Sequence, residues 1–239
     1  MTSSYVYDSP EQAEARFKGD DEGFIYSRYG NPTVKMFEDR LAAIEGGEKC
    51  FATSTGMAAV FSSMMCFLEQ GDKIVASRAL FGSCYQILTK VFPKYGINTT
   101  FVSGQNIAEW EQAIDKNTKA VFFETPSNPT LEIIDISAVS KIAKKVGAKV
   151  IIDNVFATPI LQKPLELGVD IVVYSGTKHI DGQGRALGGA IISDKEYYEK
   201  HLKPYMRHTG ASLSPFNAWI MLKGLETLKL RVEHQSDSA

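Results

Sequence analysis

Seven short apolar segments, separated by longer amphipathic stretches, constrain the fold of this chain more than any other feature. Most of these segments are rich in β-branched or aromatic residues and have no polar face, which is typical of strands covered by helices on both sides. We expect strands at 49–52, 73–77, 99–102, 120–124, 149–153, 170–174 and 189–193. Because helical patterns alternate with them, the sequence predicts an α/β fold with a mostly parallel, doubly wound, seven-stranded sheet and helices on both faces.

The predicted helices between these strands cover 56–69, 83–94, 107–114 and 136–146. Asp135 precedes the last of them and has an acceptor side chain where a helix cap belongs. Residues 1–25 are polar without a clear period, and we interpret them as an N-terminal arm. Residues 26–217 are expected to form one large domain. A long helix is predicted at 218–232, so that 218–239 would begin the connection to a further domain.

The charge and composition exclude several classes of protein. The chain has 239 residues and a net charge of −2, with no basic stripe that would indicate a nucleic-acid partner. No apolar run approaches the roughly 20 residues that cross a bilayer, and the N-terminus does not resemble a secretory signal. Cys50, Cys66 and Cys84 are too scattered for a zinc site. We therefore expect reduced thiols, no metal and a cytoplasmic protein.

Polar residues gather where three of the predicted strands end. Asp153 closes one strand, residues 175–178 follow the next, and residues 125–128 follow another. In doubly wound sheets, ligands bind beyond the carboxyl ends of the strands. The sequence therefore predicts a binding site at this edge of the sheet.

Lys178 is the residue of greatest chemical interest in this group. A lysine just past a buried strand can form an imine with an aldehyde, because partial desolvation lowers the pKa of an amine. Ser175 and Thr177 add hydroxyl groups, and Gly176 lets the backbone come close to a ligand. Together they can bind a phosphate. The alternative is a surface lysine in a turn.

Three further segments have both a chemical and a structural interpretation. The carboxylate of Asp153 can pair with a protonated pyridine nitrogen, or it can cap the segment that follows. Residues 53–59 form a hydroxyl-rich turn into a helix, where a phosphate is attracted, although helix starts with small residues are common. The glycines at 182–188 resemble a dinucleotide loop, but they precede a strand and their spacing is wrong. We exclude a nicotinamide site there.

Five motifs, in their order along the chain, carry a resemblance to a known family. They are YSRYGNPT at 26–33, STGM at 54–57, ETPSNP at 124–129, DNVFATP at 153–159 and SGTK at 175–178. The chain resembles the Cys/Met-metabolism enzymes, which are the cystathionine γ-synthase-like group of pyridoxal-phosphate proteins, over nearly its whole length. The resemblance implies an aspartate-aminotransferase-like (fold type I) domain, pyridoxal 5'-phosphate as cofactor, and a homotetramer built from two tight dimers.

The resemblance also implies roles for particular residues. Lys178 matches the Schiff-base lysine, which also moves protons between substrate carbons, and Asp153 matches the partner of the pyridine nitrogen. Asn128 matches a residue near the phenolic oxygen of the ring. The implied phosphate ligands are Gly56, Met57, Ser175 and Thr177. Tyr26 and Arg28 match a pair that reaches the phosphate in the neighbouring subunit's site, so a dimer with shared sites is implied.

Two details point to a subgroup of this family. Phe81 stands where many members have a tyrosine stacked on the cofactor ring; a phenylalanine can stack but cannot move a proton. The segment KHIDGQGR at 178–185 is similar to that of the O-succinylhomoserine sulfhydrylases. Both favour a transferase that carries out γ-replacement on an O-acylhomoserine, with the succinyl ester preferred, using sulfide to give homocysteine in methionine biosynthesis and transsulfuration. The alternative is a cystathionine γ-synthase, or a γ-lyase of cystathionine or methionine.

The chain departs from the family at its ends. Members of the family continue into a smaller C-terminal domain that supplies an arginine for the substrate carboxylate, whereas this chain ends at Ala239. It also lacks part of the family's N-terminal arm. We therefore expect a fragment, and the second alternative is a chain that binds the cofactor and dimerises without catalysing a reaction.

Overall fold

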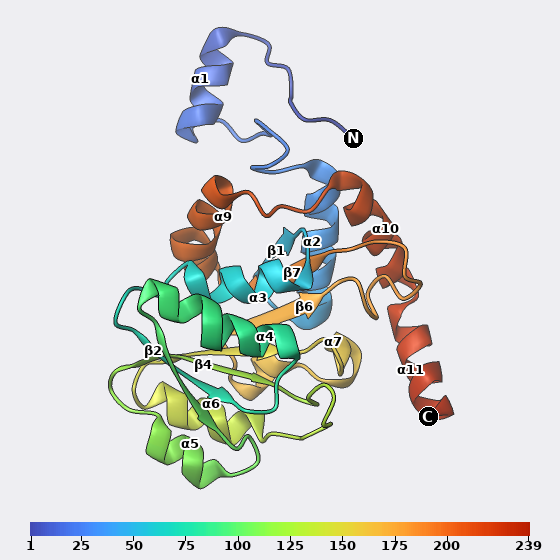
Figure 1. Ribbon diagram of the computed structural model, residues 1–239. Helices are drawn as coiled ribbons and strands as arrows, with labels where there is room; N and C mark the ends of the chain where they lie inside the picture. Colours follow the sequence, from blue (N-terminus) through green and yellow to red (C-terminus); the bar gives the residue numbers. More distant parts are fainter.

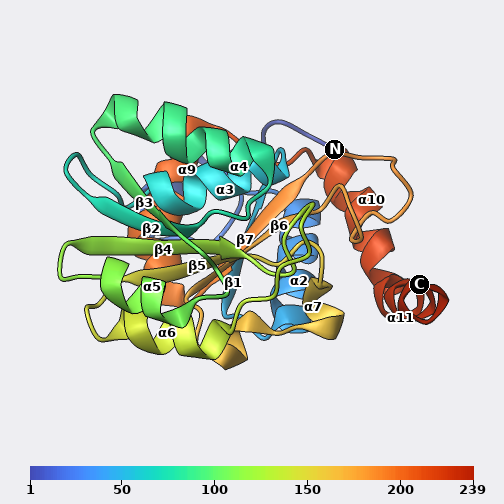
Figure 2. The ribbon, with the colours of Figure 1, turned by 60° about the horizontal axis from the view of Figure 1, so that its bottom comes forward.

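A computed structural model describes residues 1–239 and contains one seven-stranded sheet with helices on both faces (Figures 1 and 2). The strands are β1 (Lys49–Thr53), β2 (Lys73–Ser77), β3 (Asn98–Val102), β4 (Thr118–Glu124), β5 (Lys149–Asp153), β6 (Ile171–Ser175) and β7 (Gly189–Ser193). Their order in the sheet is β1-β7-β6-β5-β4-β2-β3, and β7 pairs antiparallel with both of its neighbours while the other pairs are parallel. The expected mostly parallel α/β sheet is confirmed.

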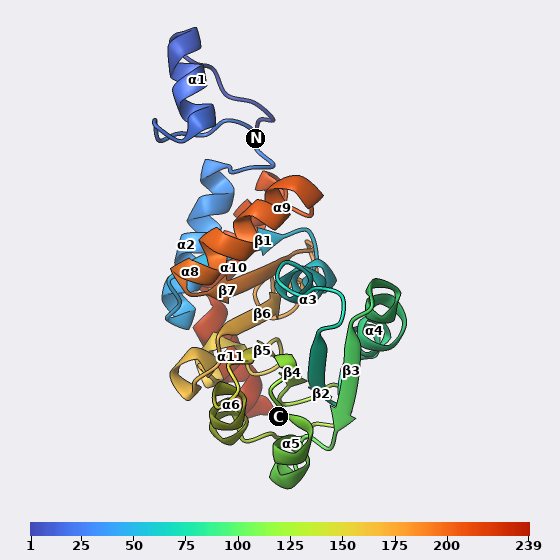
Figure 3. The same cartoon turned by 90° about the vertical axis from the view of Figure 1, so that its left-hand side faces the viewer.

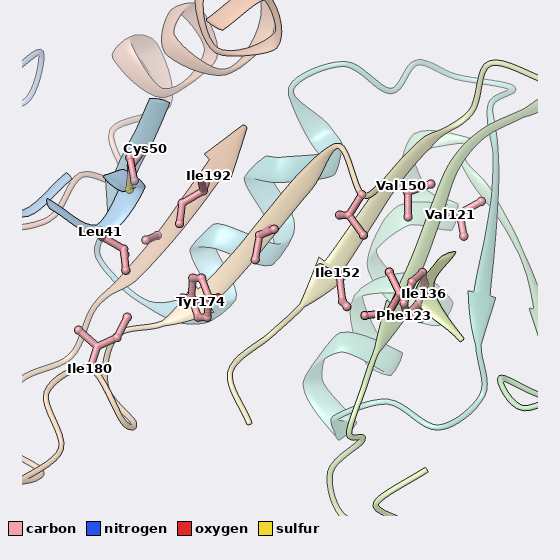
Figure 4. Close-up of a cluster of buried hydrophobic side chains, with 14 of the residues drawn as sticks. Leu41, Cys50, Val121, Phe123, Ile136, Val150, Ile152, Tyr174, Ile180 and Ile192 are labelled. Carbon is pink, nitrogen blue, oxygen red and sulfur yellow. The ribbon is translucent and has the colours of Figure 1, made fainter. Parts of the chain in front are cut away.

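The strands send alternate side chains into two separate apolar clusters. In β5, Val150 and Ile152 belong to the larger cluster, whereas Ile151 belongs to the smaller one on the opposite face. Tyr174 of β6 and Ile192 of β7 join the larger cluster, which Figure 4 shows in close-up. Because successive strand residues point to opposite faces and both faces are covered, the buried middle positions of these strands need apolar side chains on both faces.

Helices cover each face of the sheet. The face with the larger cluster carries α2 (Pro32–Glu45), α5 (Ile107–Ala113), α6 (Ile136–Lys144), α7 (Thr158–Leu161), the 3-10 turn η3 (Pro164–Leu167), α10 (Pro215–Glu226) and α11 (Leu228–Ser238). The other face carries α3 (Gly56–Met65), α4 (Gly82–Gln86), the π turn η1 (Ile87–Val91), the 3-10 turn η2 (Phe92–Tyr95), α8 (Lys195–Tyr197), the π turn η4 (Tyr198–Leu202) and α9 (Lys203–Thr209). No helix is both long and apolar enough to span a bilayer.

The N-terminal segment contains a helix that we did not expect. Helix α1 (Pro10–Lys18) buries no residue and stands away from the body of the molecule (Figures 1 and 3). The side chain of Ser9 caps its first turn, and Gly19 ends it in a left-handed conformation. These are ordinary start and stop signals, so a cap-based search would have predicted this helix.

The single helix that we predicted over 218–232 is wrong. Helix α10 ends at Glu226 and α11 begins at Leu228, because Thr227 leaves the helical region with φ −114° and ψ 5°. The spacing of apolar residues in the sequence continues across Thr227, so it does not indicate that the helix is interrupted there. The cause is tertiary: Gly224 packs against the carbonyl of Ile180, and Arg231 of α11 donates to the carbonyl of Gly224.

Smaller differences concern the boundaries of other elements. The helix predicted at 83–94 is divided into α4, η1 and η2, and helices α2, α8 and α9 were not predicted. The strand expected to start at Asp170 starts one residue later. The side chain of Asp170 instead accepts hydrogen bonds from the backbone N of Val150 at 2.8 Å and from Lys149 Nζ at 3.3 Å. This residue therefore joins β5 and β6 through its carboxylate.

Candidate functional site

A cavity of about 480 Å³ lies at the carboxyl ends of β4, β5 and β6. The structure brings eight of the ten sequence-predicted cofactor-binding residues together in its lining. They are Gly56, Met57, Phe81, Asn128, Asp153, Ser175, Thr177 and Lys178. They come from the ends of three neighbouring strands, from the start of α3 and from the segment before α4. Parallel strands end at one edge of a sheet, which explains why residues so far apart in the sequence meet here.

Lys178 lies in a tight turn that follows β6. Its backbone N donates to the carbonyl of Ser175 at 3.3 Å, and its own carbonyl accepts from the backbone N of Gly182 at 2.7 Å. The side chain is exposed and borders the cavity. The partial burial that we expected for a lysine just past a strand is therefore wrong for this chain, because the turn carries the residue out of the sheet layer. The amine is open to a ligand in the cavity.

Asp153 ends β5 and presents its carboxyl group to the cavity. One oxygen, Oδ1, accepts a hydrogen bond from the backbone N of Val155 at 3.0 Å, so the residue does cap the following segment. No lysine or arginine forms an ion pair with it. Burial, with the charge of Glu124 adding to it, raises the pKa of Asp153 to about 7. A protonated ring nitrogen beside this carboxyl group would favour its charged form and so lower its pKa again, against both effects.

The start of α3 and the end of β6 form one wall. Thr55 caps the helix, its Oγ1 accepting from the backbone N of Ala58 at 3.0 Å. A Cβ on Gly56 would lie 2.6 Å from Cβ and 2.9 Å from Cα of Ser175, so only glycine allows the helix to begin this close to the strand. The first amides of a helix have no carbonyl partner within it, and they form its positive end. This wall is suited to an anion such as a phosphate.

Hydroxyl groups complete the same wall. Ser175 follows the buried part of β6, and its side chain faces the amide end of α3. Thr177 Oγ1 accepts from the backbone N of Gly188 at 3.2 Å and donates to the carbonyl of that residue at 3.3 Å. Thr177 is thus held against the strand that follows, while the hydroxyl of Ser175 has no partner within the chain.

Glu124, which our sequence analysis did not single out as a site residue, fixes two walls of the cavity. It ends β4 and is 5% exposed. Its Oε2 accepts from the backbone N of Phe81 at 2.9 Å, and its Oε1 accepts from the backbone N of Asn128 at 2.6 Å. Burial raises the pKa of Glu124, against the effect of these two bonds. The signal that could have found it is its position at a strand end next to that of Asp153.

A buried polar network that we also missed joins the same strand ends on the opposite face of the sheet. The hydroxyl of Tyr174 donates to Glu45 Oε2 and accepts from Asn154 Nδ2 at 2.6 Å. Gln162 Nε2 donates to Asn154 Oδ1 at 2.7 Å and to the carbonyl of Thr125 at 3.0 Å. Tyr174 is itself among the residues that line the cavity, and Thr125 and Asn154 directly follow two others, Glu124 and Asp153. The network therefore fixes β4, β5 and β6 relative to one another.

Glu45 is the ionisable end of this network. It is fully buried at the end of α2, and its Oε1 has no hydrogen-bond partner. Burial raises the pKa of Glu45 to about 7, although the hydrogen bond from Tyr174 acts in the opposite direction.

Tyr26 and Arg28, the other two predicted residues, do not line this cavity. Arg28 borders a second cavity of about 450 Å³, and its Nη1 donates to the carbonyl of Arg207. The guanidinium groups of Arg28 and Arg207 lie 4.7 Å and 4.2 Å from the ring centre of Tyr29. Neither arginine forms an ion pair. One chain alone thus leaves two cationic groups without an anion, at a distance from its own site.

Comparisons with known proteins place these features in context. The family model described as Cys/Met metabolism PLP-dependent enzyme matches residues 1–239. The chain is 56% identical to an O-succinylhomoserine sulfhydrylase from Mycobacterium tuberculosis and 41% identical to an L-methionine gamma-lyase from Fusobacterium nucleatum. All of the chain aligns with both, and it spans 59% of the length of the first and 61% of the second.

A solved structure supports the same comparison. It is a putative O-acetylhomoserine (thiol)-lyase from Campylobacter jejuni, with N'-pyridoxyl-lysine-5'-monophosphate named in its title. The TM-score is 0.93 at 35% sequence identity, and the match covers 100% of this chain and 67% of the other. The whole arrangement of strands and helices around the cavity thus has a counterpart in a solved protein.

Proposed function

Because the chain belongs to the family of Cys/Met metabolism PLP-dependent enzymes, we propose that it acts as a sulfhydrylase, making homocysteine from an O-acylated homoserine and sulfide. The expected fold type I architecture and pyridoxal phosphate dependence are confirmed by the family and by its structural neighbour. The succinyl ester is the substrate that we favour, in keeping with the higher identity to a sulfhydrylase than to a lyase.

The cavity fits pyridoxal phosphate, which has an aldehyde, a basic ring nitrogen and a phosphate. Lys178 offers an exposed amine, and Asp153 offers a carboxyl group without a cationic partner. The start of α3, pressed against Ser175 by the absence of a side chain at Gly56, offers free amides and a hydroxyl to the phosphate. When bound, the cofactor supplies an electron-poor ring that takes up the charge left when a proton departs from the α-carbon.

The residues of the chain would divide the work as follows. Lys178 would hold the cofactor covalently through Nζ. Once the amino acid has displaced it, Nζ would remove the α-proton and return protons to neighbouring carbons. Asp153 would keep the ring nitrogen protonated. Asn128, held by Glu124, would face the phenolic oxygen.

The observation that most favours a sulfhydrylase is the phenylalanine at position 81. Its backbone N is held by Glu124, and its side chain lines the cavity while remaining 43% exposed. An aromatic ring here can stack on the cofactor, but it has no hydroxyl with which to move a proton to a leaving thiol. A reaction in which a carboxylate leaves does not need such a proton donor at that position.

We also propose that two copies of the chain share their sites, within a homodimer or a tetramer of two dimers. Arg28 and Tyr26 lie outside the chain's own cavity, and the guanidinium group of Arg28 has no anionic partner. The phosphate bound to a second copy would supply that anion. The three cysteines are free, which supports a reducing compartment such as the cytoplasm.

The decisive assay for the reaction is to incubate the pyridoxal-phosphate-loaded protein with O-succinylhomoserine and sulfide. Homocysteine is the expected product. If no homocysteine forms and α-ketobutyrate is released from cystathionine or methionine, the protein is a lyase. Replacing sulfide with cysteine separates a sulfhydrylase from a cystathionine γ-synthase.

One structural observation favours a second function, cofactor binding without turnover. The lining of the cavity contains no arginine, so this chain by itself has no guanidinium to anchor a substrate carboxylate. The chain also spans only 59% of the length of the sulfhydrylase that it matches. A chain that turns yellow with pyridoxal phosphate but is inert toward every amino acid would support this alternative.

A further inference from the structure

Arg231 occupies an unusual place for an arginine near the end of a chain. It lies on α11 between Leu228 and Val232, which are 1% and 3% exposed. Residues three and four apart share one face of a helix, so Arg231 is on the face of α11 that packs on the body. It therefore points toward the body of the protein, whereas an arginine on a helix more often faces solvent.

Its guanidinium group donates to four acceptors at once. Nη1 donates to the carbonyl of His179 at 2.7 Å, and Nη2 donates to the carbonyl of Ile180 at 3.3 Å. Nη2 also donates to the carbonyl of Gly224 at 2.8 Å, and Nε donates to Thr227 Oγ1 at 3.1 Å. Two of these acceptors belong to the residues that directly follow Lys178. The other two are in the last turn of α10, at Gly224, and at the break between α10 and α11, at Thr227.

The packing around this group leaves little freedom. A Cβ on Gly182 would lie 2.0 Å from Arg231 Nη1, and a Cβ on Gly224 would lie 2.1 Å from the carbonyl oxygen of Ile180. Gly182 also has a φ of +71°, a conformation that other residues rarely adopt. The absence of a side chain at Gly182 thus leaves space for the guanidinium group, and its absence at Gly224 leaves space for the carbonyl of Ile180 in the turn.

No carboxylate competes for Arg231. The nearby Asp181 is fully buried and is already paired, since it accepts from Arg185 Nε at 2.9 Å and from the backbone N of Arg185 at 2.7 Å. Arg231 therefore gives its donors to main-chain oxygens. The planar fork of a guanidinium fixes several acceptors in one geometry, which an ammonium group cannot do.

We propose that Arg231 is a positioning residue, which holds the turn at 178–182 so that the amine of Lys178 stays aligned with Asp153 and Ser175. The role given to Lys178 rests on the proposed function, whereas the hold on the turn does not. Without the guanidinium, the carbonyls of His179 and Ile180 lose their donors and the turn becomes mobile.

The test compares Arg231→Ala and Arg231→Lys with Arg40→Ala, a control that removes an exposed arginine whose only ion pair is to Glu226 at 3.9 Å. Amide hydrogen exchange is measured at Asp181 and Gly182, whose N–H groups donate to Gly176 at 2.9 Å and Lys178 at 2.7 Å. We expect exchange at these two amides to become at least about tenfold faster in Arg231→Ala, with β5 unchanged. Arg231→Lys should give a smaller change of the same kind, and the control none.

A second readout links the turn to the cofactor. Pyridoxal phosphate is added to each variant, and the fraction fixed to the protein by borohydride reduction is followed in time. Attachment should slow by about tenfold in Arg231→Ala, by less in Arg231→Lys and not at all in the control. If Arg231→Ala does not fold, Arg231→Lys carries both measurements.

The proposal is overturned if exchange at Asp181 and Gly182 is unchanged, or if it rises equally in β5, which would make Arg231 a support of the whole domain. It is also overturned if the turn becomes mobile while attachment keeps its rate. Failure of the proposed function is distinguishable, because the unmodified protein would then form no homocysteine from O-succinylhomoserine and sulfide, or attach no cofactor at all, while the exchange result stands.

Discussion

Glu124 and Asp153 stand opposite each other in the register of β4 and β5, so two carboxyl groups share the floor of one cavity. They have different tasks. Both oxygens of Glu124 are engaged by backbone amides, those of Phe81 and Asn128, whereas Asp153 keeps one oxygen for a ligand. Burial and the charge of Glu124 together raise the pKa of Asp153 to about 7. Glu124 thus fixes two walls of the site and also raises the pKa of Asp153, the carboxyl group that would face a cationic ring.

The first prediction concerns this pair. Glu124→Gln removes a negative charge beside Asp153, so the pKa of Asp153 should fall from about 7 toward the usual range of an aspartate. The titration of the Asp153 carboxyl carbon, followed by NMR in the protein without cofactor, measures this directly. Glu111→Gln, an exposed control, should leave the midpoint in place. An unchanged midpoint in Glu124→Gln would show that burial alone sets this pKa.

The second prediction concerns the buried Glu45. Its folded pKa of about 7 lies above its unfolded value, so its contribution to stability is fully present below pH 4 and is lost as the pH rises through 7. Glu45→Gln keeps an acceptor for Tyr174 but does not titrate. Between pH 5 and pH 8 the free energy of unfolding should therefore fall by about 2 kcal/mol less in the variant than in the unmodified protein.

Urea unfolding at several pH values tests this expectation. Glu233→Gln, which changes an exposed glutamate on α11, serves as the control and should keep the pH dependence of the unmodified protein. Parallel curves for Glu45→Gln and the unmodified protein would mean that Glu45 does not titrate between these pH values.

The third prediction concerns the contact between α3 and β6. Gly56→Ala should cost about 1–3 kcal/mol of stability, because the new Cβ meets main-chain and side-chain atoms of Ser175 below 3 Å. It should also weaken pyridoxal phosphate binding by at least about tenfold, since the amides at the start of α3 would move. Gly82→Ala is the matched control, because nothing lies within 4 Å of its added Cβ. Equal behaviour of the two variants would contradict a phosphate site at this contact.

The fourth prediction concerns sharing of sites between subunits. Arg28→Ala should weaken cofactor binding in a homodimer, and Lys178→Ala should abolish covalent attachment. In a mixed dimer, the Arg28→Ala chain keeps its own Lys178 and receives Arg28 from its partner, so one of the two sites should be intact. Titration of mixed and unmixed variants with pyridoxal phosphate measures the recovery. No recovery on mixing would place Arg28 outside the neighbour's site.

The sheet could be predicted because most of its strands are buried on both faces; the edge strand β3 is the exception. The buried middle of a strand such as β5, residues 150–152, has to be apolar, and its end is marked by the carboxylate of Asp153. The cluster of site residues then follows from topology, since parallel strands end at the same edge. Ser175 and Lys178 were recognisable for this reason before any contact was known.

Arg231 and Glu45 could not be predicted in this way. On α11 the other charged residues, such as Lys229 and Glu233, face solvent, and on α2 exposed residues such as Lys35 alternate with the inward Glu38 and Glu45. No local pattern separates an inward charged residue from an outward one. Arg231 turns inward because the carbonyls after Lys178 need donors, and Glu45 does so because Tyr174 meets it across the sheet. Both depend on contacts between segments more than 50 residues apart.

The identity of the lysine that binds the cofactor is the most direct test of the proposed site. The protein is mixed with pyridoxal phosphate, reduced with borohydride and digested, and the peptides are analysed by mass spectrometry. We predict a single pyridoxyl adduct, located on the peptide that contains Lys178, and none in Lys178→Ala, while the exposed Lys229→Ala keeps it. An adduct on another lysine, or one that persists in Lys178→Ala, would contradict the proposed site.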